Sequence, residues 1–254
     1  MEIYHHPPAW LEALSWGSLA VAFATAAVIL ADIYGRGHRQ KMPIMEAVYP
    51  ISALYWGPVA LWFYLRFGRR KSKKIMAERA SSPGPGAMAM EERPEQGERS
   101  SEDQEDRVRW WQVAKADSHC GAGCTLGDIG AEWLVFTLGL LIAGKALYAD
   151  FPLDLAFAWT LGVVFQYFTI VPMRDLGPLR GIWAAIRADT LSIVAFQIGL
   201  FAGMFVYQEL IFPNPLPKTS ATYWMFMQLS MILGFFTALP ANRWLLRKGW
   251  KEKM

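Results

Sequence analysis

The sequence has little cysteine, little net charge and none of the short motifs of nucleotide or zinc-protease chemistry. Two cysteines in 254 residues exclude a disulfide-stapled scaffold. The net charge is only +3, and the basic residues gather at segment ends, which argues against nucleic-acid binding. Because the chain has no P-loop, dinucleotide fingerprint or His-Glu-x-x-His pair, it lacks the machinery of nucleotide-driven pumps and zincin proteases.

Apolar residues, in contrast, make up 54% of the chain, and the mean hydropathy is +0.18. Six apolar runs are long enough to cross a hydrocarbon core about 30 Å thick. They cover residues 11–33, 45–67, 126–146, 155–173, 191–210 and 223–239. The runs are continuous rather than alternating, which favours helices over a β-barrel. The sequence therefore predicts an all-α, polytopic integral membrane protein with about six helices in the lipid bilayer.

The composition changes abruptly between the second and third runs. Residues 77–106 contain nine acidic and three basic residues and almost no aromatic ones, so they cannot bury enough apolar surface to offset the entropy of ordering. We predict an amino-terminal helix pair (1–75), a disordered acidic linker (76–108) and a four-helix transmembrane domain (109–254). The linker is also a candidate docking segment for a protein partner.

Basic residues indicate the orientation in the membrane, because they are retained on the cytoplasmic side. With both termini inside, the inner face carries 14 Lys and Arg residues and the outer face carries 5. This predicts a multi-pass protein of the inner (plasma) membrane with two cytoplasmic termini. The first outer loop disagrees locally, because it contains Arg36, Arg39 and Lys41.

An imidazole, two thiols and a carboxylate cluster around the start of the third run. His119, Cys120, Cys124 and Asp128 lie within ten residues. Imidazole and thiolate ligate Cu(I), Zn(II) or iron, and Asp128 supplies a fourth ligand or orients the others. The leading hypothesis is therefore a transition-metal site, with copper as the favoured cofactor, that serves metal handling or a redox role.

Two local geometries are open for this segment. In a continuous helix, Cys120, Cys124, Asp128 and Glu132 recur every fourth residue and form one stripe. In an open segment, Thr125 caps a new helix, and Cys124 lies at its amino terminus, where the helix dipole favours thiolate. Either geometry puts sulfur at the membrane boundary. A metal-free dithiol–disulfide couple is an alternative role for the two cysteines.

Other polar groups lie at predicted helix ends and inside the helices. Arg174, Asp175, Asp189 and Asn242 form a candidate polar cluster near the cysteines, with capping and snorkelling as structural alternatives. Amides near mid-membrane are supplied by Gln166, Gln197 and Gln228. These groups support a second functional hypothesis, a secondary transporter of a small solute. A non-catalytic membrane assembly partner is the third.

Several short segments also carry a family resemblance. They are His119-Cys120-Gly121-Ala122-Gly123-Cys124, Phe165-Gln166-Tyr167, Pro172-Met173-Arg174, Ala188-Asp189-Thr190 and Pro240-Ala241-Asn242-Arg243. Together they resemble a family of prokaryotic integral membrane proteins, the domain of unknown function 4396, over essentially the whole chain except the acidic linker. The resemblance implies a multi-pass membrane protein.

Overall fold

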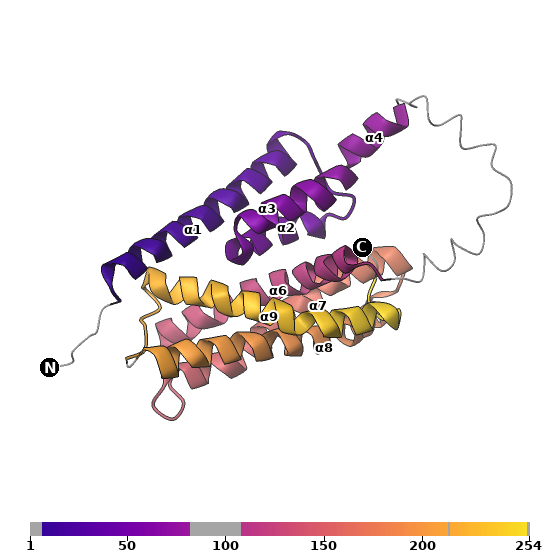
Figure 1. Ribbon diagram of the computed structural model, residues 1–254. Helices are drawn as coiled ribbons and strands as arrows, with labels where there is room; N and C mark the ends of the chain where they lie inside the picture. Colours follow the sequence, from indigo (N-terminus) through magenta and orange to yellow (C-terminus); the bar gives the residue numbers. More distant parts are fainter. Residues whose placement is uncertain (1–6, 82–107, 213, 253–254) are drawn as a thin grey trace.

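The computed structural model describes residues 7–81, 108–212 and 214–252, and all regular elements in these ranges are helical (Figure 1). The amino-terminal part contains α1 (Ala9–Leu30), its π-helical extension Ala31–Gly35, α2 (Ile44–Trp56), α3 (Pro58–Phe63) with its continuation Tyr64–Gly68 and Arg69–Lys71, and α4 (Lys73–Ser81). The carboxy-terminal part contains α6 (Trp110–Leu138), α7 (Ala146–Arg174), α8 (Pro178–Phe205) with its extension Val206–Ile211, and α9 (Ala221–Arg247). The all-α prediction is confirmed.

Four helices in the described ranges are long and apolar enough to cross a membrane. They are α1 with its extension, α7, α8 with its extension, and α9. α6 has the same length as α7, 29 residues, and packs along it, but it carries buried charged residues that lower its hydropathy. A polytopic membrane protein is thus supported, whereas the predicted count of six crossings is not confirmed.

The segment 45–67 forms a hairpin of two short helices rather than one crossing helix. Gly57 joins α2 to α3 with a φ of +51°, which favours glycine, and Pro58 has no backbone N–H to continue α2. The two ends of the hairpin lie side by side, because the Lys73 N–H donates to the Arg39 carbonyl at 2.9 Å. The chain therefore leaves the hairpin at the same end of the molecule at which the hairpin began.

Helices α6 to α9 form an antiparallel four-helix bundle. Small residues allow the backbones of α6 and α7 to come close. A Cβ atom added at Gly127 would lie 2.4 Å from the backbone nitrogen of Ala158, and one added at Gly123 would lie 2.8 Å from the Cα of Gly162. This close contact leaves no space for lipid between α6 and α7 and buries one face of α6 inside the bundle.

The amino-terminal helices pack along one side of this bundle. α1 runs parallel to α9, since Ser15 Oγ donates to Thr222 Oγ1 at 3.3 Å and Ser18 Oγ donates to Gln228 Oε1 at 2.7 Å. The Gln228 amide in turn donates to the Leu54 carbonyl of α2 at 2.6 Å. The start of α1 therefore lies at the opposite end from the end of α9 (Figure 1). We call the end that holds the start of α6 and the end of α9 the linker end, and the opposite end the far end.

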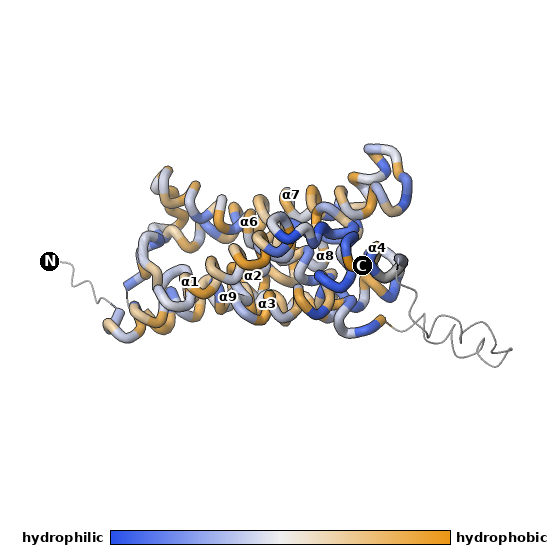
Figure 2. The backbone as a smooth tube through the Cα atoms, turned by 90° about the horizontal axis from the view of Figure 1, so that it is seen from above, coloured by the Kyte–Doolittle hydropathy of each residue, from blue (hydrophilic) through white to orange (hydrophobic). Residues whose placement is uncertain are grey.

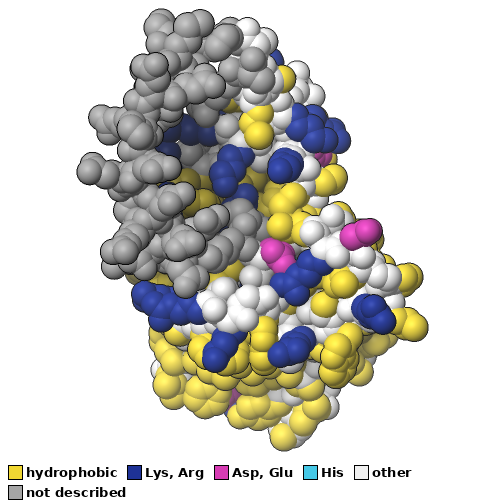
Figure 3. Space-filling view, turned by 90° about the vertical axis from the view of Figure 1, so that its right-hand side faces the viewer, with side chains coloured by type: hydrophobic (Ala, Val, Ile, Leu, Met, Phe, Trp, Pro, Cys, Tyr) yellow, Lys and Arg dark blue, Asp and Glu magenta, His cyan; other side chains and the backbone are white. Residues whose placement is uncertain are grey.

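Basic residues separate between these two ends. Arg36, Arg39 and Lys41 lie at the linker end, because α1 carries the chain there. The sequence prediction places these three basic residues in an outer loop, against the usual cytoplasmic location of basic residues. Of the Lys and Arg residues that the structure describes, only Lys145 and Lys218 lie at the far end. Figure 2 shows hydrophilic residues gathered near the C-terminus and α4, and Figure 3 shows Lys and Arg side chains spread over the linker end.

The predicted acidic linker lies mostly outside the described residues. Its first residues are helical, because α4 continues to Ser81. Residues 82–107 are not described, and docking of a partner through the linker stays a prediction.

Labelling of single cysteines tests the hairpin topology. In a Cys120→Ser/Cys124→Ser background, we expect Arg36→Cys and Arg70→Cys to react with a membrane-impermeant maleimide from the same side, because the hairpin returns to the linker end. Leu141→Cys, in the loop between α6 and α7 and 62% exposed, should react from the other side. Labelling of positions 36 and 70 from opposite sides would show instead that 45–67 crosses the membrane.

Candidate functional site

The predicted metal motif lies inside a continuous helix. α6 begins at Trp110, so the motif starts in its third turn, and the Thr125 hydroxyl donates to the Gly121 carbonyl at 2.7 Å rather than capping a helix. The helical alternative is therefore the one found, and the open alternative is wrong. Cys120 and Cys124 are free thiols and fully buried, so both sulfurs lie in the bundle interior.

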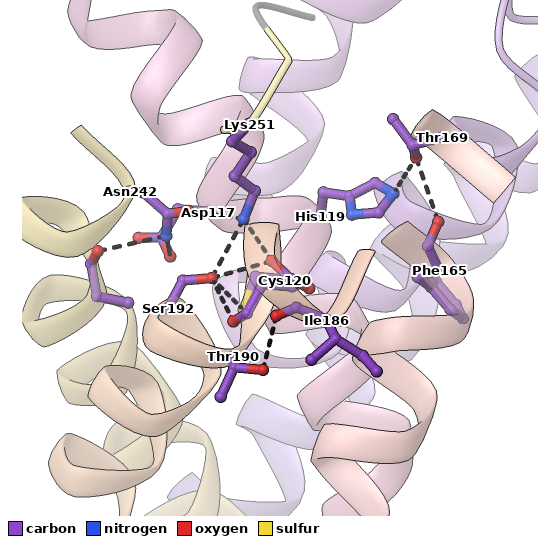
Figure 4. Close-up of polar contacts among 12 residues, drawn as sticks. Asp117, His119, Cys120, Phe165, Thr169, Ile186, Thr190, Ser192, Asn242 and Lys251 are labelled. Atoms are coloured by element: carbon purple, nitrogen blue, oxygen red, sulfur yellow. Dashed lines mark hydrogen bonds and ion pairs between the residues drawn. The ribbon is translucent and has the colours of Figure 1, made fainter. Parts of the chain in front are cut away.

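The four predicted metal ligands face different neighbours. His119 Nε2 lies 2.8 Å from Thr169 Oγ1 on α7, whereas Cys120 Sγ accepts a hydrogen bond from Ser192 Oγ on α8 at 3.4 Å (Figure 4). The Asp128 carboxylate lies about two turns further along α6, where it accepts a hydrogen bond from an α8 side chain. The described residues contain no group of three or more His, Cys, Asp and Glu side chains placed to hold a metal ion. The predicted ligands do not converge on one site.

A buried polar cluster closes the linker end of the bundle. Lys251 Nζ donates to Asp189 Oδ1 at 2.6 Å, to Asn242 Oδ1 at 2.7 Å and to Ser192 Oγ at 3.2 Å. Asn242 Nδ2 donates to Asp117 Oδ1 at 2.8 Å. We call these five residues the linker-end cluster. Figure 4 shows the Lys251 side chain extending toward Ser192, while His119 lies to one side and contacts Thr169.

The Lys251 side chain is fully buried and forms an ion pair with Asp189. Burial on its own lowers the pKa of Lys251, but the Asp189 carboxylate, with further help from Cys120 and Asp117, outweighs burial and raises that pKa above its usual value. The Oδ2 atoms of Asp117 and Asp189 are buried and have no hydrogen-bond partner. The cluster therefore has acceptor capacity that Lys251 does not use.

Only part of the predicted polar cluster comes together. Asp189 and Asn242 belong to the linker-end cluster. Arg174 forms an ion pair with Glu252 at the surface instead. Asp175 ends α7 with a φ of +49° and is exposed, so it lies outside the cluster.

A second charged cluster lies at the far end. Lys218 forms ion pairs with Glu132 and Asp150, and its ammonium also donates to the Glu132 carbonyl at 3.1 Å. Asp154 is fully buried beside them, and neither of its carboxylate oxygens has a hydrogen-bond partner. We call these four residues the far-end cluster. A cavity of about 340 Å³ reaches it, and its polar lining includes Lys145, Asp150, Gln208, Glu209, Lys218 and Tyr223.

One face of α6 joins the two clusters. Asp117, Cys120, Cys124, Asp128 and Glu132 follow one another at intervals of three or four residues, and all are fully buried. The helix rises about 22 Å between the first and last of them. One oxygen of Asp128 accepts a hydrogen bond from α8 at 2.7 Å, and the other has no partner. We call this face the α6 polar line.

Five residues of the two clusters were not among the predicted site residues: Asp117, Asp150, Asp154, Lys218 and Lys251. The carboxylates had a detectable signal, because Asp150 and Asp154 lie one helical turn apart in a helix that is otherwise strongly apolar. The two lysines had no detectable signal in the sequence. They lie outside the apolar runs, where a lysine ordinarily indicates only the orientation of the chain in the membrane.

The fold and its interior chemistry define a class, namely a polytopic helical membrane protein whose four-helix bundle buries ionisable side chains. Residues 109–251 match the family described as domain of unknown function DUF4396, and the chain belongs to that family. The matched region contains both clusters and the α6 polar line. It does not extend to the amino-terminal helices, to which the sequence resemblance was also assigned. No curated protein and no solved structure matches the chain.

The far-end cluster generates a stability prediction. Lys218→Met should lower the free energy of unfolding by about 3–5 kcal/mol, because it leaves the Glu132 and Asp150 carboxylates buried without their cation. Adding Glu132→Gln removes one of these charges and should restore part of the loss. Thermal unfolding of detergent-purified protein measures both effects. Lys248→Met, at an exposed lysine, is the matched control, and equal stability of the two lysine variants would contradict the prediction.

Proposed function

We propose that the four-helix domain is a membrane transporter that moves protons between the two clusters along the α6 polar line. The observation that carries this proposal is the continuity of buried ionisable and polar side chains from one end of the bundle to the other. Ionisable groups inside a membrane are costly and mark ion and proton pathways. The proposal belongs to the transporter class that the sequence supports as its second hypothesis.

Charge balance supports the proton as the moving species. The bundle interior holds six carboxylates, and two lysines form ion pairs with them; these residues are Asp117, Asp128, Glu132, Asp150, Asp154, Asp189, Lys218 and Lys251. A third lysine, Lys115, is also buried. Three ammonium groups cannot neutralise six carboxylates, and an unpaired charge is very costly away from water, so under this proposal some of the carboxylates hold a proton. Asp128 and Asp154 suit this role, since each has an oxygen without a hydrogen-bond partner.

The three predicted mid-membrane glutamines play different parts. Gln197 donates to Asp128 Oδ1 at 2.7 Å and so contacts the α6 polar line. Gln166 is fully buried, and neither atom of its amide has a hydrogen-bond partner. Gln228 ties α9 to α1 and α2, which is a packing role. Under this proposal, the carboxylates carry the proton and Gln197 supports one of them.

We infer that the linker end faces the cytoplasm. All described Lys and Arg residues except Lys145 and Lys218 lie at that end, and basic residues are retained on the cytoplasmic side of an inner membrane. The carboxyl terminus is then inside and the amino terminus outside. This inferred orientation differs from the sequence prediction of two cytoplasmic termini, because the 45–67 hairpin returns the chain to the linker end.

Proton flux into liposomes tests the proposed function. Reconstituted protein should dissipate an imposed pH gradient faster than protein-free liposomes, as measured with a trapped pH-sensitive dye. Asp128→Asn should slow the flux by about tenfold or more, because an amide cannot accept and release the proton. Glu12→Gln, at an exposed carboxylate on α1, is the control. Wild-type flux in Asp128→Asn, or no flux in wild type, would refute the proposal.

Metal handling is the second proposal, supported by donor chemistry and by two free, fully buried thiols, Cys120 and Cys124, one helical turn apart on α6. His119 would have to leave Thr169 to join them. Protein exposed to Cu(I) and then desalted should retain copper, and the Cys120→Ser/Cys124→Ser variant should lose it. Elemental analysis measures both. Equal copper content in the two proteins would contradict metal binding through the thiols.

A further inference from the structure

The ammonium group of Lys251 lies in a compact oxygen site. A carboxylate oxygen of Asp189, the amide oxygen of Asn242 and the hydroxyl of Ser192 surround it at 2.6, 2.7 and 3.2 Å. An ammonium group has three N–H donors, so this set uses all of them. The side chains of Lys251 and Asp189 are both 0% exposed. The site is therefore built and closed from water.

The same oxygens suit a free monovalent cation. Sodium coordinates carboxylate, carbonyl and hydroxyl oxygens, and an ammonium ion donates hydrogen bonds to the same groups. The single charge of Asp189 balances one positive charge. The buried Oδ2 atoms of Asp117 and Asp189 have no partner and offer further lone pairs. The residues of the cluster thus carry unpartnered carboxylate oxygens in addition to the three oxygens that Lys251 contacts.

Lys251 enters this site from a short segment that follows α9. The helix ends four residues before Lys251, and Gly249 turns the chain back toward the bundle with a φ of +65°. The segment is held by Arg174, which donates to the Gly249 carbonyl at 2.8 Å, and by Arg187, whose guanidinium lies 3.8 Å from the centroid of the Trp250 ring. Arg174 is partly exposed, and surface contacts of this kind are individually weak. The segment is also held by the Arg174–Glu252 ion pair and by backbone hydrogen bonds to the last turn of α9. Because residues 248–252 follow the helix rather than form part of it, their release would not require α9 to unfold.

We propose that the linker-end cluster is a monovalent-cation site and that Lys251 is its tethered occupant. While residues 248–252 stay bound, the ammonium group fills the site and closes the linker end. When they withdraw, a diffusible monovalent cation occupies the same oxygens. This proposal deepens the proposed function. It rests on the proposed function only for the path that an ion takes beyond this site.

Cation-dependent thermal stability tests the site. Detergent-purified Lys251→Ala is unfolded in ammonium, sodium or choline chloride at equal ionic strength, with choline as a cation too large for the site. Ammonium or sodium should raise the Tm of Lys251→Ala over its value in choline by about 3–6 °C at ten times Kd, with saturation. The comparison of the two salts identifies which ion fits. Wild type and Lys248→Ala should show no such difference, since their site is filled.

Two further variants complete the test. Asp189→Asn in the Lys251→Ala background should abolish the response, because it removes the balancing charge. Arg174→Ala keeps every ligand of the site and Lys251 itself but weakens the attachment of residues 248–252. This variant should therefore show a smaller cation-dependent rise in Tm. It replaces Lys251→Ala in the test if Lys251→Ala does not fold. No cation-specific response in either Lys251→Ala or Arg174→Ala, or an equal response in wild type, would overturn the proposal. This readout does not use proton flux, so it fails independently of the proposed function.

Discussion

The four-helix bundle depends on the neutralisation of charge in its interior. Carboxylates are removed from water at both ends of α6, and an ionised carboxylate without a partner is strongly destabilising there. Two lysines meet part of this demand, and both come from chain outside the helices: Lys218 precedes α9, and Lys251 follows it. The segments that flank α9 must therefore fold inward over the helix ends. Charge burial fixes not only side chains but also the course of the chain at both ends of the bundle.

Helix packing decides which side of α6 becomes the polar line. Gly127 meets the backbone of Ala158, and Gly123 meets Gly162, so α6 and α7 touch through small residues. The adjacent face, with its thiols and carboxylates, is then directed at α8, where Ser192 supplies one hydrogen-bond donor. Close packing and polar pairing thus support each other, since a wider separation would admit lipid to groups that need polar partners.

The sequence was informative wherever hydropathy alone decides structure. α1, α7, α8 and α9 are continuous apolar runs, and their existence was predicted correctly. The prediction of a single helix over residues 45–67 was wrong, because the Gly57-Pro58 turn lies inside an apolar segment and hydropathy does not detect a change of backbone direction. The first turns of α6 were missed because the polar stripe from Asp117 interrupts the apolar signal. The pairing of Lys251 could not be predicted, since it depends on tertiary folding of residues far apart in sequence.

The two ends of the polar line are closed in different ways. At the far end, a cavity of about 340 Å³ reaches Asp150 and Lys218. At the linker end, Lys251 is fully buried under its own segment. A proton route open at both ends at once is a channel, whereas a transporter that works by alternating access keeps one end closed at any time. Under the proposed function, this structure is the state that is accessible from the far end. The opposite state requires the release of residues 248–252 and closure of the far-end cavity, and both changes involve loops and side chains rather than rearrangement of the tightly packed α6–α7 pair.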